Sequence, residues 1–300
     1  MTAHASTQAT VVVRRPVMGV AASRRSDLRQ ARELLRNLVG KELKVRYKQS
    51  VLGFAWSLVT PLLMTAIFTT VFAVFLRIPV HNFASYFLAG YLLWQFFSNS
   101  VTVSVGAIVG NGALIRKVYF PREVIPLSLV LSQAVHLGLA MLAMSPLFFI
   151  QRGNFLPYLP ALLLFLVLLL AFTTGVSMLF AAVNVTFRDL QELTQVIFLA
   201  WFYGTPVIYP MFLVEASAHP AILWLINANP MTWFVRAFQR ILHGVPAPLP
   251  PDGAVDPDTV IGPGWPSLTN LWICAAWAVV ALVVGWWMFH RRAVSFAKEV

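Results

Sequence analysis

The chain has 300 residues, of which 59% are hydrophobic and 11% are charged, and its mean hydropathy is +0.74. A soluble globular domain has about a quarter of its residues charged, so this composition excludes that class and indicates a multi-pass membrane protein. The net charge of +11 would suit nucleic-acid binding, but 11 of the 22 lysines and arginines lie in residues 1–52, before the first apolar run. Basic segments beside membrane spans explain this distribution, so we expect no nucleic-acid partner.

The N-terminal region divides into two predicted parts. Residues 1–25 contain no uninterrupted apolar stretch of the length that a signal peptide needs, and we predict a disordered cytoplasmic tail. Residues 26–50 have apolar side chains at roughly helical spacing, with basic side chains on the other faces. These apolar positions are Leu28, Ala31, Leu35, Leu38 and Val45. We predict an amphipathic interfacial helix on the inner membrane surface; an ordinary basic tail is the alternative.

Long runs without charged residues fill most of the remaining chain. A spanning helix needs about 20 mostly apolar residues. We predict an all-α membrane protein in which residues 51–300 form a six-span transmembrane domain. The predicted spans cover about 53–76, 85–112, 125–150, 158–184, 190–212 and 269–289.

The stretch between the fifth and sixth spans does not fit a further crossing. Gly204, Pro206 and Pro210 interrupt the end of the fifth run, and the apolar run within 220–230 is too short to cross a bilayer. It is also too apolar for an aqueous loop. We therefore predict a re-entrant hairpin over 216–240, because irregular backbone is tolerated at membrane depth where protein covers it.

The distribution of basic residues orients the predicted spans. With six spans and a cytoplasmic N-terminus, the cytoplasmic segments carry 18 lysines and arginines and the outer segments carry four. A seventh span over 216–235 would move the basic C-terminus outside and weaken this asymmetry. We therefore expect both termini in the cytoplasm.

The sequence lacks the motifs of several kinds of chemistry. It has no phosphate-binding loop, since Gly40-Lys41 is its only Gly-Lys pair and no glycine lies five residues earlier. It has no Cys/His cluster at metal-ligand spacing and no Gly-x-Ser-x-Gly motif, and the predicted inner spans carry no ionisable relay of the kind that ion-coupled transporters use. We expect no catalytic residue, bound cofactor or metal here, and a channel-like or scaffold role driven from outside the chain.

Four segments, taken in order, resemble the membrane subunit of type-2 ABC exporters. They are ELKVRYKQSVLGFAWSLVTPLL (42–63), LIRKVYFPREVIPLS (114–128), NVTFRDLQELTQVIFLAWFYGTPVIYP (184–210) and NPMTWFVRAFQRILHG (229–244). The resemblance covers about residues 28–300, and the ordered combination of four segments is specific. Within that group, the chain is most similar to exporters of lipid-linked polysaccharide, such as O-antigen, teichoic acid, capsule or galactan.

The resemblance implies a partner and a mechanism. It implies a homodimer in the bacterial inner membrane, two copies of a separate nucleotide-binding ATPase subunit that use ATP and Mg, and a channel for a lipid-linked glycan at the dimer interface. One alternative is a type-2 exporter of a drug or small lipid. Another is an integral membrane glycosyl- or acyltransferase, which would need a carboxylate or histidine constellation; Asp189 and Glu192 are the only candidates.

The charged segment between the second and third spans is the first candidate site. Pro121 and Pro126 prevent the two spans from merging into one helix, so we predict a short helix and turn at the inner face. Its cations suit acidic groups of an ATPase and its aromatic residues offer an apolar anchor. The predicted coupling or gating residues are Arg116, Lys117, Tyr119, Phe120, Pro121, Arg122, Glu123, Arg188 and Asp189. Two simpler interpretations are a plain basic loop and a capping pair of Thr186 with Asp189.

Aromatic residues form the second candidate site. Aromatic faces stack on the C–H faces of sugar rings, so an aromatic-lined channel would suit a polysaccharide. The predicted channel-lining residues are Tyr91, Trp94, Phe97, Trp201 and Tyr203. The alternatives are an interfacial aromatic belt and ordinary helix packing.

Overall fold

A computed structural model describes residues 20–47, 56–78, 80–117, 120–152, 154–217, 219–244 and 262–299. Every regular element in these ranges is helical, which confirms the predicted all-α class. The elements are α1 (Val20–Tyr47), α2 (Trp56–Phe68), η2 (Thr69–Phe75), α3 (Phe83–Val105), α4 (Ala107–Gly110), α5 (Gly112–Lys117), α6 (Val124–Arg152), η3 (Leu156–Tyr158), α7 (Leu159–Thr186), α8 (Leu190–Tyr203), α9 (Met211–Ser217), α10 (Pro220–Ala228), α11 (Pro230–Leu242) and α12 (Leu268–Glu299).

Four of the described helical segments are long and apolar enough to cross a membrane. They are Leu58–Phe75, Val124–Ile150, Leu156–Thr186 and Leu268–Ala293. They correspond to the first, third, fourth and sixth predicted spans. The other two predicted spans correspond to α3, which is rich in serine and aromatic residues, and to α8, which has 14 residues.

Helices α3 and α8 both end directly before a glycine. The predicted second span, 85–112, is divided in the structure, because α3 ends at Val105 and Gly106 separates it from α4. The predicted fifth span, 190–212, ends at Tyr203, directly before Gly204 and the prolines that follow it. A helix of 14 residues is only about 21 Å long, so α8 is shorter than the hydrocarbon core of a bilayer.

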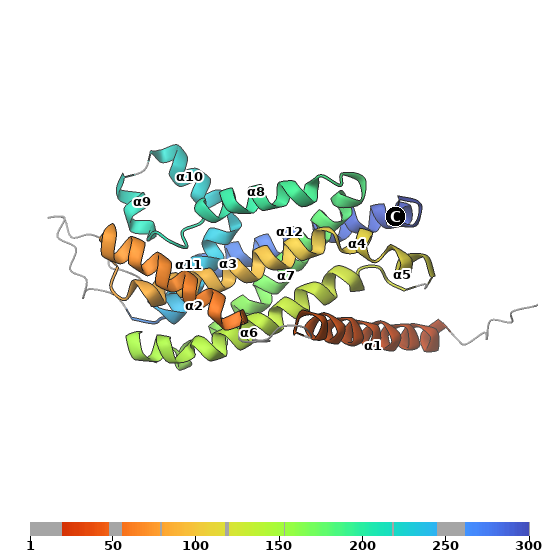
Figure 1. Cartoon of the computed structure of the whole chain (residues 1–300), viewed down its shortest axis with the longest axis horizontal. Coiled ribbons are helices and arrows are strands. Elements are labelled where there is room, and N and C mark those ends of the chain that lie inside the picture. Colours follow the sequence, from red (N-terminus) through yellow and green to blue (C-terminus); the bar gives the residue numbers. More distant parts are fainter. Residues whose placement is uncertain are drawn as a thin grey trace, which may run out of the picture.

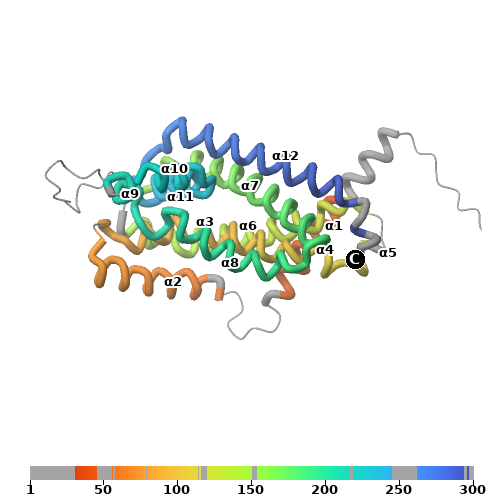
Figure 2. The backbone as a smooth tube through the Cα atoms, turned by 90° about the horizontal axis from the view of Figure 1, so that it is seen from above, coloured from red at the N-terminus to blue at the C-terminus, as the bar shows by residue number. Residues whose placement is uncertain are grey.

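Helix α3 lies in the centre of the bundle, against α6, α7 and α11 (Figures 1 and 2). Sixteen of its 23 residues are buried. Its buried serine hydroxyls keep hydrogen-bond partners: Ser100 donates to the Phe96 carbonyl at 2.6 Å and Ser104 donates to the Ser100 carbonyl at 2.7 Å. A central helix can therefore be less hydrophobic than the four outer spans.

Helices α10 and α11 form a hairpin whose turn is Asn229. The turn lies beside the end of α8, whereas the far end of α11 reaches the start of α3, where the Ser85 hydroxyl and His243 Nδ1 are 2.8 Å apart. Helix α11 is mostly buried against α3, α7 and α12, while α10 is mostly exposed. Figure 1 shows α9 and α10 together at one end of the bundle.

Helix α1 packs against α6 and runs obliquely to the bundle, as Figures 1 and 2 show together. It begins at Val20, so residues 20–25 are helical and the prediction of a disordered tail up to residue 25 was too long; residues 1–19 lie outside the described residues. Leu35 and Leu38 are half-buried, whereas Arg32 is exposed, as an amphipathic helix requires. Val45 departs from the predicted apolar stripe, being 64% exposed.

The bundle has two distinct ends (Figure 1). One end holds α4, α5, the start of α6 and the C-terminal part of α12, and we call it the α5 end. The opposite end holds α9, α10 and the start of α3, and we call it the hairpin end. Basic segments predicted to be cytoplasmic thus gather at the α5 end.

Candidate coupling and transport sites

A separate apolar cluster supports the α5 end. It joins residues from α4, α5, α6, α7 and α12, and it is distinct from the main core. Its fully buried members include Phe289 and Phe296, whose ring centroids are 5.1 Å apart in an edge-to-face arrangement. The cluster comprises Ala107, Ile108, Ile115, Ile125, Met178, Ala181, Ala182, Val185, Phe289 and Phe296.

The charged segment between α5 and α6 packs on this cluster. Ile115 and Ile125, which flank the segment, are both buried in it, and Phe120 packs against it. Three backbone bonds close the turn: the amides of residues 124, 125 and 127 donate to the carbonyls of residues 121, 122 and 123, each at 3.2 Å. The short helix and turn predicted here are therefore present.

The predicted coupling residues differ in their surroundings. Pro121 is exposed, and Arg122 and Glu123 are half-buried. Tyr119 and the side chains of Arg116 and Lys117 lie outside the described residues, and their coupling role stays a prediction.

Helix α12 supplies contacts to this end that we did not predict. His290 Nδ1 lies 3.2 Å from Glu123 Oε1, which links the end of α12 to the start of α6. Arg292 Nη1 lies 3.4 Å from the Ala182 carbonyl and 3.3 Å from the Thr186 hydroxyl, both on α7. The HRR sequence at 290–292 fits the general enrichment of basic residues on the cytoplasmic side of a membrane. Its sequence alone therefore gave no sign of these contacts.

The predicted capping pair of Thr186 and Asp189 is wrong. Thr186 is the last residue of α7, not the first cap of α8, and its hydroxyl accepts from Arg292. Asp189 occupies the N-cap position of α8 but makes no side-chain capping bond. Arg188 and Asp189 are both exposed at the α5 end, which leaves the predicted coupling role of this turn as a proposal.

The predicted channel-lining aromatics fall into two groups. Trp94 and Phe97 are buried, with exposures of 6% and 0%, and Phe97 lies 5.1 Å from the half-buried Trp201 by ring centroids. Phe198 and Phe202 complete this cluster between α3 and α8. Within this subunit, Trp94, Phe97 and Trp201 pack between α3 and α8, and a channel-lining role for them stays a prediction.

Tyr91 and Tyr203 lie differently. Tyr91 is half-buried and stacks on Phe87 with a centroid distance of 5.1 Å. Tyr203 is 58% exposed on α8, and its carbonyl accepts from the Tyr209 hydroxyl at 3.0 Å. Of the five aromatics, Tyr203 presents the most surface to a neighbour outside the subunit.

Asn229 joins α8 to the hairpin, a role that sequence reasoning missed. Its Oδ1 accepts from Trp201 Nε1 at 2.8 Å and from the Met231 amide at 2.9 Å. Its Nδ2 donates to the Gly204 carbonyl at 3.0 Å and to the Thr205 hydroxyl at 2.8 Å. The Asn-Pro pair at 229–230 is the sequence signal for the helix cap, but the contact with α8 depends on the fold.

Comparison with known proteins decides the family. Residues 33–243 match the ABC-2 type transporter family. The chain belongs to this family. The resemblance found in the four segments is thereby confirmed, and the ABC-2 chain is a transport component, not an enzyme in its own right.

The relatives of this ABC-2 chain include polysaccharide export proteins. The O-antigen export system permease protein RfbA of Myxococcus xanthus is 34% identical over 218 residues, which cover 72% of this chain and 83% of that relative. RfbA of Klebsiella pneumoniae is 31% identical over 71% of this chain and 82% of the relative. The polysialic acid transport protein KpsM of Escherichia coli is 22% identical over 65% of this chain and 75% of the relative.

Proposed function

We propose that this chain is the permease subunit of an exporter that moves a lipid-linked polysaccharide across the bacterial inner membrane. Two copies form a homodimer with a channel at their interface, and two copies of a separate ATPase subunit bind and hydrolyse ATP with Mg. This chain binds no cofactor itself. The observation that carries the proposal is the similarity of about 70% of the chain to O-antigen export permeases.

The α5 end is the proposed docking surface for the ATPase. The turn around Pro121 packs on the apolar cluster, which contains residues of α6, α7 and α12. A displacement of the turn would therefore move these three long helices together. The link from Glu123 to His290 adds a polar connection along the same route. We place this end in the cytoplasm, where the basic residues of the chain are concentrated.

The hairpin of α10 and α11 is proposed to enter the membrane from the opposite side. Its turn lies at the depth of Trp201, which contacts Trp94 and Phe97 on the central helix α3. The turn backbone is covered by protein and its polar groups are bonded, as irregular structure at membrane depth requires. On this proposal, α3 and α8 complete a six-helix domain.

The proposed dimer channel runs along exposed apolar faces. Helices α2 and α8 present large hydrophobic side chains outward, which contact lipid or a second copy in a membrane protein. Tyr203 lies among them and is the aromatic residue best placed to meet a passing glycan. The exposed residues on the two helices include Leu62, Leu63, Ile67, Leu193, Val196, Leu199 and Tyr203.

Reconstitution tests the proposal. The chain is purified with the proposed partner ATPase subunit and placed in vesicles with a lipid-linked polysaccharide. We expect ATP hydrolysis above that of the ATPase alone, and ATP-dependent appearance of the glycan on the trans side, measured by lectin binding. Export of a drug or small lipid without glycan would overturn the substrate class. Turnover of a lipid-linked sugar by the isolated chain, without ATP, would overturn the permease role.

A further inference from the structure

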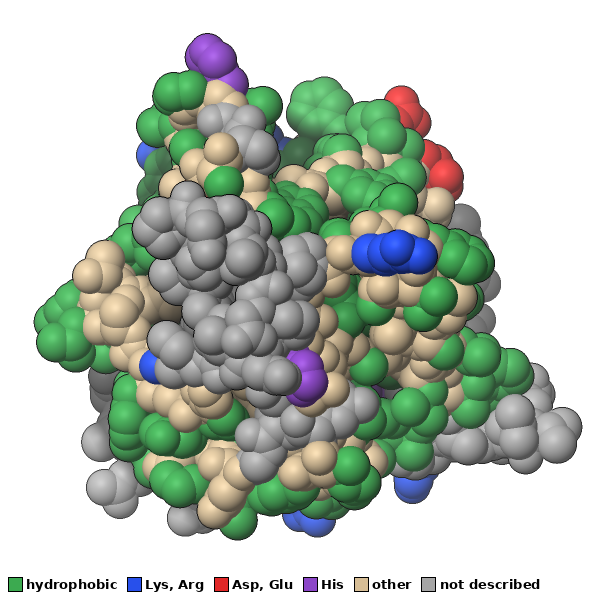
Figure 3. Space-filling view, turned by 90° about the vertical axis from the view of Figure 1, so that its left-hand side faces the viewer, with side chains coloured by type: hydrophobic (Ala, Val, Ile, Leu, Met, Phe, Trp, Pro, Cys, Tyr) green, Lys and Arg blue, Asp and Glu red, His purple; other side chains and the backbone are tan. Residues whose placement is uncertain are grey.

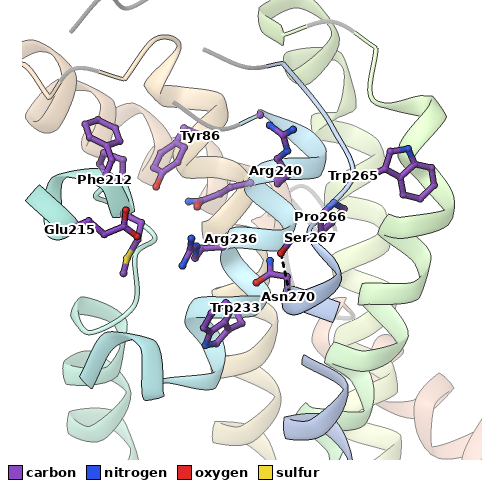
Figure 4. Close-up of a pocket in the computed structure, with 14 residues that line it drawn as sticks. Tyr86, Phe212, Glu215, Trp233, Arg236, Arg240, Trp265, Pro266, Ser267 and Asn270 are labelled. Atoms are coloured by element: carbon purple, nitrogen blue, oxygen red, sulfur yellow. Dashed lines mark hydrogen bonds between the residues drawn. The ribbon is translucent and has the colours of Figure 1, made fainter. Parts of the chain in front are cut away.

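A pocket of about 520 Å³ opens between α3, α9, α11 and the start of α12 (Figure 4). This size is within the range of small-molecule sites, about 300–1,000 Å³. Tyr86, Trp233, Arg236, Gln239, Arg240 and Asn270 contribute to its lining. The pocket is separate from the cluster at the α5 end and from the aromatic cluster around Trp94.

The pocket lies at the hairpin end, opposite the proposed ATPase surface. Tyr86 is near the start of α3, and its hydroxyl donates to the Tyr209 carbonyl at 3.1 Å. Figure 3 shows this end of the molecule, where hydrophobic and uncharged surface predominates over charged side chains. Two arginines in a shared pocket therefore stand out from their surroundings.

Arg236 and Arg240 are four residues apart on α11, so they lie on the same helical face. Both are half-buried, and neither has a carboxylate within 4 Å among the residues that the structure describes. Arg236 lies over the ring of Trp233, with its Cζ 5.4 Å from the ring centroid. Figure 4 shows Glu215 across the pocket on α9, a single acidic lining residue against the two arginines.

The remaining lining suits a sugar. Trp233 is half-buried and provides aromatic surface for the C–H faces of a pyranose ring, while Tyr86 lines the pocket with 3% of its surface exposed. Gln239 and Asn270 are buried, with exposures of 4% and 7%, and their amides are positioned on the pocket wall. The Gln239 amide is held in place because its Nε2 donates to the Pro206 carbonyl at 3.2 Å.

We propose that this pocket binds an acidic sugar residue, meaning a pyranose that carries a carboxylate or a phosphate, as the glycan emerges at the outer face. Two guanidinium groups favour such an anion because each presents planar donors that match carboxylate or phosphate oxygens. A neutral sugar would leave both arginines without an anionic partner. The proposal rests on the proposed export function for the source of the ligand, but not for its binding.

Binding is tested on the purified full-length chain without ATPase, so the result does not depend on transport. Glucuronate, glucose 1-phosphate and glucose are titrated by saturation-transfer NMR, and inorganic phosphate, which has no carbon-bound protons to observe, is titrated as a competitor of glucuronate. We expect both acidic sugars to bind at least tenfold more tightly than glucose and than phosphate alone. Equal binding of glucose would overturn the requirement for an anion. Equal binding of phosphate would overturn the requirement for a sugar, and the absence of any binding would overturn the site.

Variants locate the site. Arg236→Gln and Arg240→Gln should each weaken the binding of glucuronate at least tenfold, whereas Arg236→Lys, which keeps the charge but not the planar fork, should weaken it less than Arg236→Gln. Arg77→Gln is the matched control, because Arg77 is an exposed arginine that does not line the pocket. Loss of binding in the control, or unchanged binding in both pocket variants, would overturn the assignment. Loss of export with intact sugar binding would count against the proposed function alone.

Discussion

At the scale of single residues, the Asn229 side chain links two helical segments through four hydrogen bonds. It caps α11 and also satisfies groups at the end of α8, so four hydrogen bonds depend on one amide. These groups are partly buried, and an unsatisfied buried polar group costs about 1–3 kcal/mol. Asn229 therefore fixes where the hairpin turn sits relative to α8.

Asn229→Ala should lower the free energy of unfolding by about 2–4 kcal/mol, because it removes the helix cap and leaves polar groups on α8 unpaired. Thermal unfolding of the detergent-solubilised protein measures the effect as a fall in apparent Tm. Asn154→Ala is the matched control: Asn154 is exposed, and its Oδ1 accepts from the nearby Leu156 amide at 2.9 Å, a bond that joins no two helices. Equal Tm losses in the two variants would show that the link to α8 contributes no stability.

The residue scale also shows what sequence reasoning could not reach. Trp94 and Trp201 were singled out for channel lining because aromatic side chains suit sugars, and the same property lets them pack in a core. Whether Trp94 lines a channel or packs in a core depends on its neighbours. These include Trp201 of α8, which lies about 100 positions later in the chain. Tyr203 follows Trp201 by two residues, which is about 200° around the helix axis, so it points outward while Trp201 faces the bundle.

At the scale of elements, α7 and α12 are packed so closely that their backbones touch. A methyl group built on Gly175 would overlap the backbone of Ala281, and one built on Gly285 would overlap the backbone of Gly175. Small residues permit this approach, which is how membrane helices gain van der Waals contact without a hydrophobic driving force. The contact joins two of the four long apolar helices along most of their length (Figure 2).

Gly175→Ala should force α7 and α12 apart and lower stability by about 3 kcal/mol or more, because backbone cannot yield as a side chain does. Gly138→Ala is the control, since Gly138 is also inside a long helix but an added methyl meets nothing within 4 Å. There the better helix propensity of alanine should leave the apparent Tm unchanged or higher. A Gly175→Ala protein as stable as the Gly138→Ala protein would contradict the close packing.

Element boundaries were predictable where composition alone determines them. The runs that became α6, α7 and α12 are long, apolar and free of internal charge, so a helix in a membrane is their only satisfactory conformation. Helix α3 shows the opposite case, because its serines lower its hydropathy although their hydroxyls bond within the helix, and its end at Gly106 is not marked by any charge or proline. The early end of α8 was signalled by Gly204 and Pro206, although the predicted span ran past them.

At the scale of the whole molecule, charge and apolar packing are divided between the two ends. The α5 end combines basic segments with its own apolar cluster, whereas the hairpin end carries few charges, and three of them, Arg236, Arg240 and Glu215, line the pocket. The charge asymmetry could be predicted from the sequence, because it follows from the number of lysines and arginines in each segment between spans. The second cluster was not, since its members come from five helices spread over about 190 positions.

The position of the charged segment between α5 and α6 at the α5 end leads to a testable prediction about coupling to the ATPase. Simultaneous Arg116→Glu, Lys117→Glu and Arg122→Glu should abolish the stimulation of the partner ATPase and stop glycan export, because a surface that attracts acidic groups would repel them. All three residues are charged in the wild-type chain and the exchange alters no apolar residue, so the variant should still insert and elute as the wild-type permease does. The measurements are ATP hydrolysis in reconstituted vesicles and co-purification of the two subunits.

The control exchanges the same residues with their charges kept, Arg116→Lys, Lys117→Arg and Arg122→Lys, and should retain most of the stimulation. Normal coupling in the reversed variant would place the ATPase contact elsewhere, with the exposed turn at Arg188 and Asp189 as the next surface to test.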